Sequence, residues 1–353
     1  MDKTWQKIKK NPDLLKNYFV REKVIQTIRD FFKKEGFHEV FTPVMVPVPS
    51  IEPNLEVFET QLRTSTGKQK RAFLISSPEY AHKRLLAAGV GSLFEITHSF
   101  RNEEEVSRLH SPEFTILEWY RVNADYKDTM KDFEHLFLEI VGKEKMVYQG
   151  QEYDLSLPWP RITVAEAFEK FAGIDIETLL SEEKLLNAGR AKGYVVEPAD
   201  AKALADKENT TWEQMFYQIF LNEIETKIRD SHKPTFIYDY PLAQASLSRP
   251  KKEDPRFAER FEVFLAGVEL GNCFSELTDA EAQHKRFEAD LAERKKLGKT
   301  DFPIDEDFVD ALKSGMPMSS GIAVGVDRLV MLAADVPNVS DTIFFSDNEL
   351  FDL

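Results

Sequence analysis

The stretch at residues 94–120, FEITHSFRNEEEVSRLHSPEFTILEWY, constrains the fold of this chain more than any other. Apolar and polar residues alternate at both of its ends, which predicts two β-strands joined by a charged loop. The outgoing strand aims Arg101 and Glu103 away from its aromatic face, and the return strand places Glu118 and Tyr120 beside Phe114. Unpaired charges are costly to bury. The two strands therefore form either a solvated face with ion pairs or a site for charged groups.

The residue order across this stretch is F-R-N-E, a short loop, and then H-x-P-E-F-T-x-L-E-W-Y. It resembles motif 2 of the class II aminoacyl-tRNA synthetases, in the lysine branch. In that family the motif 2 arginine holds the ATP α-phosphate and the amino-acid carboxylate, which implies this role for Arg101, a planar bidentate donor. The resemblance assigns the adenine amino group to Glu103 and the adenine ring to Phe114. It adds further nucleotide-binding residues, namely Asn102, Arg108, His110 and Ser111.

The composition bounds the class of protein. A chain of 353 residues that is 42% hydrophobic can bury a large core, in one large or two smaller domains. Its net charge of −15 argues against a protein that depends on nonspecific contacts with nucleic-acid phosphates. The lone Cys273 excludes a disulfide framework and a cysteine-rich zinc site. No segment reads as a signal peptide or a membrane span, so we expect a cytoplasmic enzyme.

The first part of the chain predicts a long helix and a strand. Apolar residues recur at helical spacing over residues 18–35, and a strand over 37–43 ends at Pro43. This arrangement resembles motif 1, which builds the dimer interface in the class II family, and it implies a two-fold homodimer. An ordinary amphipathic helix on a sheet is the plainer interpretation. Residues 44–71 are polar with several prolines, so we expect loops there, before a short strand over 72–76.

The sequence Ser77-Pro78-Glu79 predicts a helix start, because serine can cap, proline suits the first helical position and glutamate complements the helix dipole. Its continuation, S-P-E-Y-x-x-K-R-L, also resembles the lysine branch, where this glutamate faces the substrate amino group. The resemblance implies a pocket for a diamino acid. Its predicted substrate residues are Ser77, Pro78, Glu79, Glu118, Tyr120, Asn272, Phe274 and Glu276.

Residues 260–277, RFEVFLAGVELGNCFSEL, carry a second group of carboxylates. The pair Ala266-Gly267 predicts a two-residue turn between apolar strands, which puts Glu262 and Glu269 on one face, diagonal neighbours about 7–8 Å apart. Two carboxylates with a cation between them suit Mg²⁺ beside a triphosphate. A solvated hairpin is the plainer interpretation. The resemblance makes Glu262 and Glu269 metal ligands, and places Glu269 and Leu270 against ATP.

Strict alternation sends Asn272, Phe274 and Glu276 to the face opposite Glu269. Both sets reach one site only if the strand bulges near Gly271-Asn272, and glycine in a strand often marks a bulge. Alanine is usual at the position of Gly271 in one related family. We therefore expect the missing methyl group to leave space beside the substrate's amino group, so that α-lysine is activated more readily than by a typical member of that family.

A third motif lies at residues 321–332, GIAVGVDRLVML. Small residues lead to Asp327-Arg328 at a predicted helix start, where close strand–helix packing is the plainer interpretation. The stretch resembles motif 3, whose arginine binds the ATP γ-phosphate. The resemblance thus implies that Arg101 and Arg328 are the catalytic residues, with ATP and Mg²⁺ bound between the motifs.

The resemblance implies an α+β fold, in which a mixed, mostly antiparallel sheet is flanked by helices. We expect residues 1–353 to form one class II synthetase-like catalytic domain, with a helical insertion at about 143–235. Lysyl-tRNA synthetases carry an N-terminal β-barrel that reads the anticodon. Motif 1 begins near residue 18, which leaves no room for that barrel, so we expect no anticodon-binding domain and no tight binding of tRNA.

Nearly the whole chain is similar to the elongation factor P–(R)-β-lysine ligases, truncated paralogues of lysyl-tRNA synthetases. L-E-W-Y at 117–120 and P-x-x-Q-A-S-L at 241–247 favour the ligases, whereas Gly271 and F-S-E-L at 274–277 match the synthetases. The resemblance implies that lysine or β-lysine is activated with ATP and transferred to a lysine side chain of elongation factor P. Alternatives are a stand-alone lysyl-adenylate enzyme with another acceptor, and a noncatalytic synthetase-like regulator.

Overall fold

The computed structural model describes residues 3–104, 106–194 and 211–352. Its α-helices are α1 (Thr4–Lys10), α2 (Leu15–Lys34), α3 (Glu79–Ala87), α4 (Tyr126–Val141), α5 (Val164–Ala167), α6 (Ile176–Leu179), α7 (Glu182–Ala191), α8 (Trp212–Ile219), α9 (Thr226–Arg229), α10 (Ala280–Lys296), α11 (Glu306–Lys313), α12 (Val326–Ala333) and α13 (Asp347–Phe351). Its strands are β1 (His38–Glu39), β2 (Met45–Val46), β3 (Glu59–Arg63), β4 (Gln69–Leu74), β5 (Leu93–Phe100), β6 (Glu113–Val122), β7 (Lys145–Tyr148), β8 (Gln151–Asp154), β9 (Arg161–Thr163), β10 (Thr235–Pro241), β11 (Phe257–Leu265), β12 (Val268–Ser275) and β13 (Ser319–Gly325).

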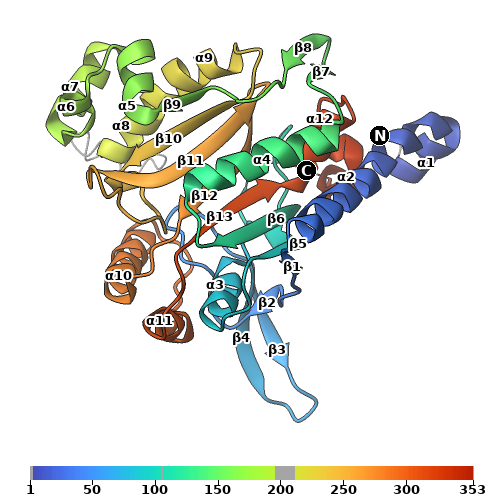
Figure 1. The fold of residues 1–353 in the computed structure, drawn as a ribbon. Helices are drawn as coiled ribbons and strands as arrows, with labels where there is room; N and C mark the ends of the chain where they lie inside the picture. Colours follow the sequence, from blue (N-terminus) through green and yellow to red (C-terminus); the bar gives the residue numbers. More distant parts are fainter. Residues whose placement is uncertain (1–2, 105, 195–210, 353) are drawn as a thin grey trace.

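Eight strands of the described chain form one mixed sheet, in the order β1-β5-β6-β13-β12-β11-β10-β9. The pairs at its two edges, β1–β5 and β9–β10, are parallel, and the pairs between them are antiparallel. The predicted strand pair within residues 94–120 is confirmed as β5 and β6, with Glu95 directly opposite Glu118. The sheet and its flanking helices give the predicted α+β fold (Figure 1).

One face of the sheet is covered by α2, α4 and α12 (Figure 1). Phe32, Phe133 and Val330 of these helices pack in one core with Trp119 and Ile322 of the strands. A large apolar side chain contributes roughly 1.5–3 kcal/mol when it is fully buried. This continuous core therefore fixes the middle strands, and with them the side chains that point to the other face.

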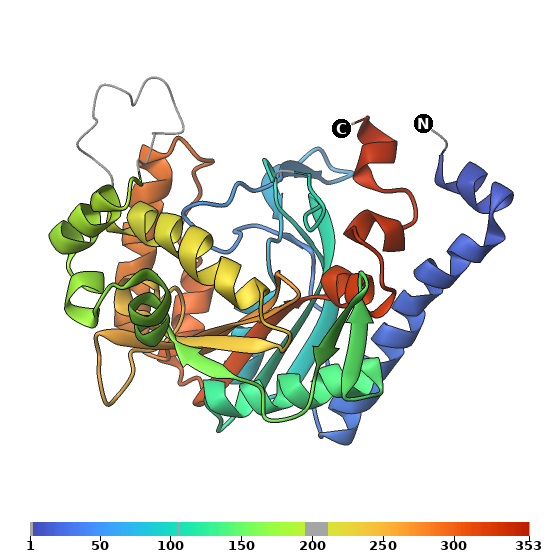
Figure 2. The same cartoon turned by 90° about the horizontal axis from the view of Figure 1, so that it is seen from above.

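The other face carries two separate cores. The helices α5–α9 lie on the side of the sheet away from α4 (Figure 2), where Phe168 and Phe216 pack with Ile237 of β10. Toward β5 and β6, Tyr80 of α3 stacks on Phe308 of α11 at a centroid distance of 4.4 Å. The strands between these cores, β11, β12, β13 and β6, are left to line a cavity.

The expectation of loops over residues 44–71 is wrong. These residues contain β2, β3 and the start of β4, which form a three-stranded sheet of their own in the order β2-β4-β3. The β3–β4 hairpin projects from the body of the molecule (Figure 1). All of β3 is exposed, so its sequence shows none of the apolar alternation that identifies a half-buried strand.

Helices dominate the described part of residues 143–235, but they begin only at Val164. Before them, β7 and β8 form a hairpin and β9 joins the main sheet beside β10. Thr163 and Glu166 form a capping box at the start of α5. A π-helical turn, Phe220–Glu225, continues α8. Residues 195–210 of the predicted insertion lie outside the described residues.

In the described part of the chain, no helix is long and apolar enough to cross a membrane.

Candidate active site

A cavity of about 600 Å³ lies on the sheet face between the two outer cores. Its volume is typical of a small-molecule site. The structure brings together most of the predicted site residues in its lining: Ser77, Glu79, Arg101, His110, Ser111, Phe114, Glu118, Tyr120, Glu262, Glu269, Leu270, Asn272, Phe274, Glu276 and Arg328.

Three other predicted residues lie beside the cavity, outside its lining. Pro78 is the N-cap residue of α3. The backbone N–H of Asn102 donates to the carbonyl of Glu56 at 3.0 Å, which closes a short bridge at the end of β5. Arg108 is exposed, and its carbonyl accepts from the N–H of Val339 at 3.0 Å. These contacts shape the loop around the cavity.

Glu103 also lies outside the lining. Its side chain is 65% exposed and pairs with Lys299 at 2.9 Å. The alternation of β5 does not continue to this residue, because the strand ends at Phe100 and Glu103 has a φ of 57°. The neighbouring Glu104 lines the cavity instead. The predicted contact between Glu103 and adenine therefore remains a proposal that requires the loop to move.

The predicted nucleotide end of the cavity is built around Arg328. Its Nη1 donates to the carbonyl oxygen of Glu269 at 2.7 Å, and its Nη2 lies 2.9 Å from Nε2 of His110. Burial and the charge of Arg328 lower the pKa of His110, so the imidazole is neutral and accepts this hydrogen bond. The Arg101 guanidinium, whose charge also acts to lower the pKa of His110, lies over the ring of Phe114, 5.2 Å from its centroid.

The β11–β12 hairpin has the predicted two-residue turn and a bulge. Phe264 pairs with Glu269, but Val263 pairs with Gly271, so Leu270 is an extra residue in β12. The bulge that the sequence predicted near Gly271-Asn272 thus lies one residue earlier. Because the extra residue reverses the alternation, Glu269 and Asn272 both line the cavity.

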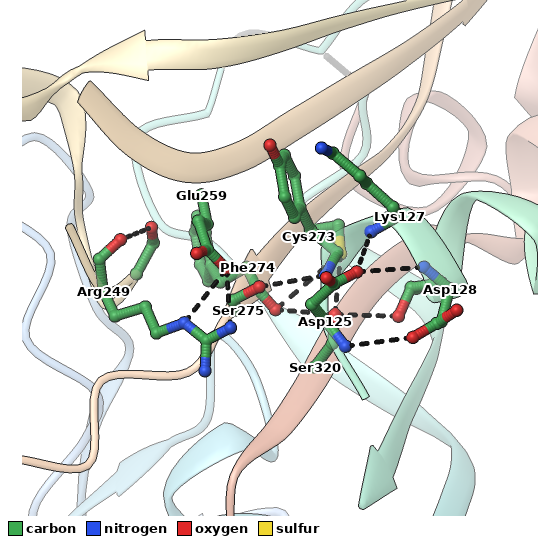
Figure 3. Close-up of polar contacts among 12 residues, drawn as sticks. Asp125, Lys127, Asp128, Arg249, Glu259, Cys273, Phe274, Ser275 and Ser320 are labelled. Carbon is green, nitrogen blue, oxygen red and sulfur yellow. Dashed lines mark hydrogen bonds and ion pairs between the residues drawn. The ribbon is translucent and has the colours of Figure 1, made fainter. Parts of the chain in front are cut away.

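The far side of β12 faces the start of α4 (Figure 3). Ser275 Oγ accepts from the N–H of Tyr126 at 2.9 Å. Ser320 Oγ of the neighbouring β13 donates to the carbonyl of Phe274 at 2.9 Å and lies 3.4 Å from Sγ of Cys273. These buried contacts fix the orientation of β12, and so turn the side chains of Asn272 and Phe274 to the cavity.

Glu262 of β11 is held by Arg260, which sequence analysis left without a role. Nη2 of Arg260 lies 2.6 Å from Oε1 of Glu262, and its Nε donates to Oδ1 of Asn272 at 3.2 Å. Burial raises the pKa of Glu262, and Glu269 adds to this effect against the opposing charge of Arg260. A cation between Glu262 and Glu269 would relieve their repulsion, so the two carboxylates fit Mg²⁺. Within the described ranges, no three acidic, histidine or cysteine side chains form a metal cluster.

Three acidic residues gather at the other end of β12. Glu79 and Glu276 share the ammonium group of the fully buried Lys83, each at 2.6 Å. Burial raises the pKa of Glu276 to about 8, and Glu79 and Glu118 add to the shift while Lys83 opposes it. Burial would lower the pKa of Lys83, but Glu276 and Glu79 outweigh it and raise that pKa. The cluster is therefore acidic, and Glu276 keeps its proton to a higher pH than an ordinary glutamate.

Glu118 is held from the side by two hydroxyl groups. Ser77 Oγ donates to its Oε1 at 2.6 Å, and the Tyr120 hydroxyl donates to its Oε2 at 3.2 Å. Gly321 makes room for this arrangement: a Cβ there would overlap the Tyr120 ring and lie 2.5 Å from Oε1 of Glu276. The absence of a side chain at Gly321 is thus what lets the acidic end of the cavity form.

Several charged residues at or beside the cavity were not predicted from the sequence, among them His82, Lys83, Arg260 and Asp327. Lys83 and His82 were taken only as part of a helix, and Arg260 only as part of a strand. Asp327 lines the cavity and accepts from the N–H of Thr115 at 2.8 Å. The spacing of Glu79 and Lys83, four residues apart on a helix, was the one local signal available. The other partners are far apart in the sequence.

The environment of Gly271 differs from the expected one. A Cβ at this position would point to β13, with Cδ1 of Ile322 and Cγ2 of Val324 each at 3.1 Å and the carbonyl oxygen of Ala323 at 3.2 Å. Ile322 and Val324 belong to the core that packs under the sheet. The expectation that an added methyl group would directly contact the substrate is therefore wrong, and its effect must pass through β13.

The family to which known proteins assign this chain is consistent with the residues that line the cavity. A family model of class II tRNA synthetases (D, K and N) matches residues 1–349. The α+β fold, with its cavity lined by arginines and paired carboxylates, is therefore that of a class II synthetase catalytic domain. Enzymes of this class use ATP, typically with Mg²⁺.

Individual relatives narrow the class. Elongation factor P–(R)-β-lysine ligases from Salmonella arizonae and Proteus mirabilis are each 39% identical, over 97% of this chain and 97% of their own length. A lysine–tRNA ligase from Moorella thermoacetica is 37% identical over 95% of this chain, but the chain spans only 66% of that protein. The chain belongs to the elongation factor P–(R)-β-lysine ligase family and is an ATP-dependent amino-acid ligase.

Proposed function

We propose that this protein activates lysine or β-lysine as an aminoacyl-adenylate and transfers it to a lysine side chain of elongation factor P in the cytoplasm. One observation carries the proposal: a single cavity is lined by Arg101 and Arg328, whose charges both act on His110, and by Glu79, Glu118 and Glu276, whose charges act on one another. The arginines suit phosphate and carboxylate groups, whereas the carboxylates suit ammonium groups. A diamino acid beside ATP carries both kinds of charge.

In the first step, the substrate carboxylate attacks the α-phosphorus of ATP. A new oxygen–phosphorus bond forms, and the bond to pyrophosphate breaks. The carboxylate is already a nucleophile, so the residues of the site need only align it and stabilise charge. We assign the α-phosphate and the substrate carboxylate to Arg101, the γ-phosphate to Arg328, and the adenine ring to Phe114.

Glu262 and Glu269 are the residues that would hold Mg²⁺. When bound, the ion would neutralise charge on the phosphate oxygens. Arg260 keeps Glu262 in its position through the 2.6 Å ion pair.

In the second step, the uncharged amine of the acceptor lysine attacks the carbonyl carbon of the adenylate. An amide bond forms, AMP leaves, and the amine nitrogen releases a proton. Glu79, Glu118 and Glu276 hold the substrate's own ammonium groups away from the reacting carbon during this step. At a net charge of −15 the chain is poorly suited to grip tRNA, so we expect no appreciable tRNA charging.

The test is pyrophosphate exchange followed by transfer. Exchange that depends on lysine or β-lysine and on Mg²⁺ is expected, followed by labelled amino acid on elongation factor P rather than on tRNA. The absence of exchange with both amino acids would overturn the activation step and promote the noncatalytic regulator.

A second candidate is a stand-alone lysyl-adenylate enzyme with another acceptor. Gly271 and the similarity to a lysine–tRNA ligase favour this alternative. Exchange with α-lysine but no transfer to elongation factor P would support it.

A further inference from the structure

His82 of α3 is fully buried between two carboxylates. Its Nε2 lies 2.8 Å from Oε2 of Glu95, and its Nδ1 lies 3.6 Å from Oε2 of Glu118. These two glutamates are directly opposite each other on β5 and β6. Like charges at such a cross-strand position repel and destabilise a sheet. The position of His82 between them therefore calls for a positive charge.

The two ring nitrogens differ in their contacts: Nε2 is hydrogen-bonded to Glu95, whereas Nδ1 has no hydrogen-bond partner among the described residues and faces the charge of Glu118 at 3.6 Å. Glu95 accepts from the N–H of Thr42 at 2.7 Å and from its hydroxyl at 2.8 Å, and Glu118 accepts from Ser77. Both carboxylates act as acceptors, so both ring nitrogens of His82 face acceptors. A neutral imidazole has only one N–H and would turn its lone pair toward an anion. The imidazolium instead presents positive charge to both carboxylates, through the hydrogen bond to Glu95 and through the 3.6 Å ion pair with Glu118.

The surrounding charges agree with a cationic ring. Burial acts to lower the pKa of His82, but Glu118 and Glu95 outweigh burial and raise it above the ordinary value. The Tyr120 ring meets the imidazole edge-on, with centroids 5.4 Å apart. The next residue on the same helix, Lys83, directs its ammonium group to Glu79 and Glu276 instead of Glu118.

Lys83 is committed to the other two carboxylates of the cluster, Glu79 and Glu276. It does not serve Glu118. Of the described side chains, His82 is thus the cation nearest to Glu118, while the hydroxyl groups of Ser77 and Tyr120 hold that carboxylate from other directions.

We propose that His82 is a positioning residue for recognition of the diamino acid: as an imidazolium held by Glu95, it fixes Glu118 so that this carboxylate faces the substrate ammonium group. The inference rests on the proposed function. His82 does not line the cavity and acts through Glu118. Thr42 and Glu95 form the outer support of this arrangement.

The kinetic test uses His82→Gln in amino-acid-dependent pyrophosphate exchange. The glutamine side chain can still donate a hydrogen bond but carries no charge. We expect KM for the diamino acid to rise about tenfold at neutral pH, the size of one charge-assisted contact, with KM for ATP unchanged. The ratio of the variant's KM to the wild-type KM should fall as pH rises, because wild-type His82 loses its proton through its raised pKa. Effects of the substrate's own titration cancel in this ratio.

A matched control is His98→Gln. His98 lies on β5 and pairs with Glu113 at 3.1 Å, but both side chains are exposed. It should leave both KM values at the wild-type level. A second variant, Glu95→Gln, keeps an acceptor oxygen for Thr42 while removing one charge, which guards against loss of folding in His82→Gln. It should lower the pKa of His82 and raise KM for the diamino acid, with KM for ATP again unchanged.

The protonation state is read directly by NMR of histidine ring signals in the free protein. His82 is assigned as the signal that His82→Gln lacks, and we expect an imidazolium at pH 7 that becomes neutral at higher pH. A neutral His82 at pH 7 would overturn the inference, as would melting temperatures that fall in both variants while KM for the diamino acid stays constant. The NMR measurement does not require enzymatic activity. A wild-type protein that shows no pyrophosphate exchange would therefore refute the proposed function but not the charge state of His82.

Discussion

Nζ of Lys83 lies 2.6 Å from Oε2 of Glu276, and both side chains are buried beside the cavity. The same ammonium group lies 2.6 Å from Oε1 of Glu79. One protein cation is thus shared by two carboxylates that we propose to bind a cationic substrate. The acidic end of the cavity is stable without substrate because Lys83 compensates part of its charge.

Replacing Lys83 by methionine should therefore destabilise the protein. The change leaves two buried carboxylates without their cation, which typically lowers the free energy of unfolding by about 3–5 kcal/mol. Chemical denaturation measures this difference. Lys131→Met is the matched control, because the Lys131–Asp128 pair is exposed and surface pairs contribute little. Equal stability of the two variants would mean that the carboxylates of the Lys83 cluster take up protons instead.

The raised pKa of Glu276, about 8, predicts a pH dependence of both stability and substrate use. In the unfolded chain this carboxyl loses its proton near its ordinary pKa of 4.5, whereas in the folded protein it keeps it to about 8. Its contribution to stability is thus present at acidic pH and declines as pH rises between these values. Substrate use should change in the opposite direction, since the ionised carboxylate binds an ammonium group. We expect kcat/KM for the diamino acid to rise toward pH 8, and Glu276→Gln to lack this rise.

Arg101 should be needed for the chemical step. Its loss removes a charge-stabilising group at the α-phosphate, an effect of about 10²–10³ in kcat for comparable donors. Arg101→Ala is expected to reduce pyrophosphate exchange by at least this factor, without a comparable loss of stability. Arg256→Ala serves as the control, because Arg256 is half-exposed and pairs only with Asp254 and Glu177 at the surface. Near-normal exchange in Arg101→Ala would contradict the assignment of this residue.

Gly271→Ala tests how a methyl group on β12 affects the choice of substrate. The added Cβ would press on Ile322 and Val324 of β13, and so displace Ala323, which lines the cavity. We expect kcat/KM to shift from α-lysine toward β-lysine. The second change Val324→Ala makes space under the sheet and should restore the original preference. A shifted ratio without this rescue would mean that β13 does not transmit the effect.

We also expect a homodimer built on residues 18–43. Phe41 is 77% exposed just after β1, and Phe19 on α2 is also exposed, so both side chains are free to pack at an interface. A two-fold axis would bury both. Phe41→Asp should shift the protein toward a monomer in sedimentation velocity. Val147→Asp, on the exposed β7, is the control and should leave the assembly unchanged. A wild-type protein that is monomeric at micromolar concentration would refute the expectation.

The sequence predicted most reliably where a local pattern determines the structure. Alternation determined the β5–β6 pair, and the Ala266-Gly267 turn determined which residues of β11 and β12 face each other. Prediction failed beyond the end of β5, because Glu103 leaves the extended conformation that alternation assumes. It failed again at β3, which is exposed on all sides.

The roles of His82 and Lys83 could not be predicted for a different reason. Apart from Glu79, four residues before Lys83 on the same helix, their partners Glu95, Glu118 and Glu276 lie on or just after strands of the main sheet. No local spacing indicates these contacts. A buried charge on a helix can be explained only when the groups that compensate it are known. The motifs could therefore indicate the class of site, but not the charge balance that supports it.

The bulge at Leu270 reverses the alternation of β12 partway along the strand, so that odd and even positions exchange faces. Before the bulge, one set of positions faces the cavity; after it, the other set does, so a single strand supplies both Glu269 and Asn272. The strand can tolerate insertions or deletions in pairs, but a single deletion at Leu270 would exchange the two faces on one side of it. Either Glu269 would turn into the core, or Cys273 and Ser275 would replace Asn272 and Phe274 in the cavity. The hairpin is therefore constrained in whether its number of residues is odd or even, as well as in which residues it contains.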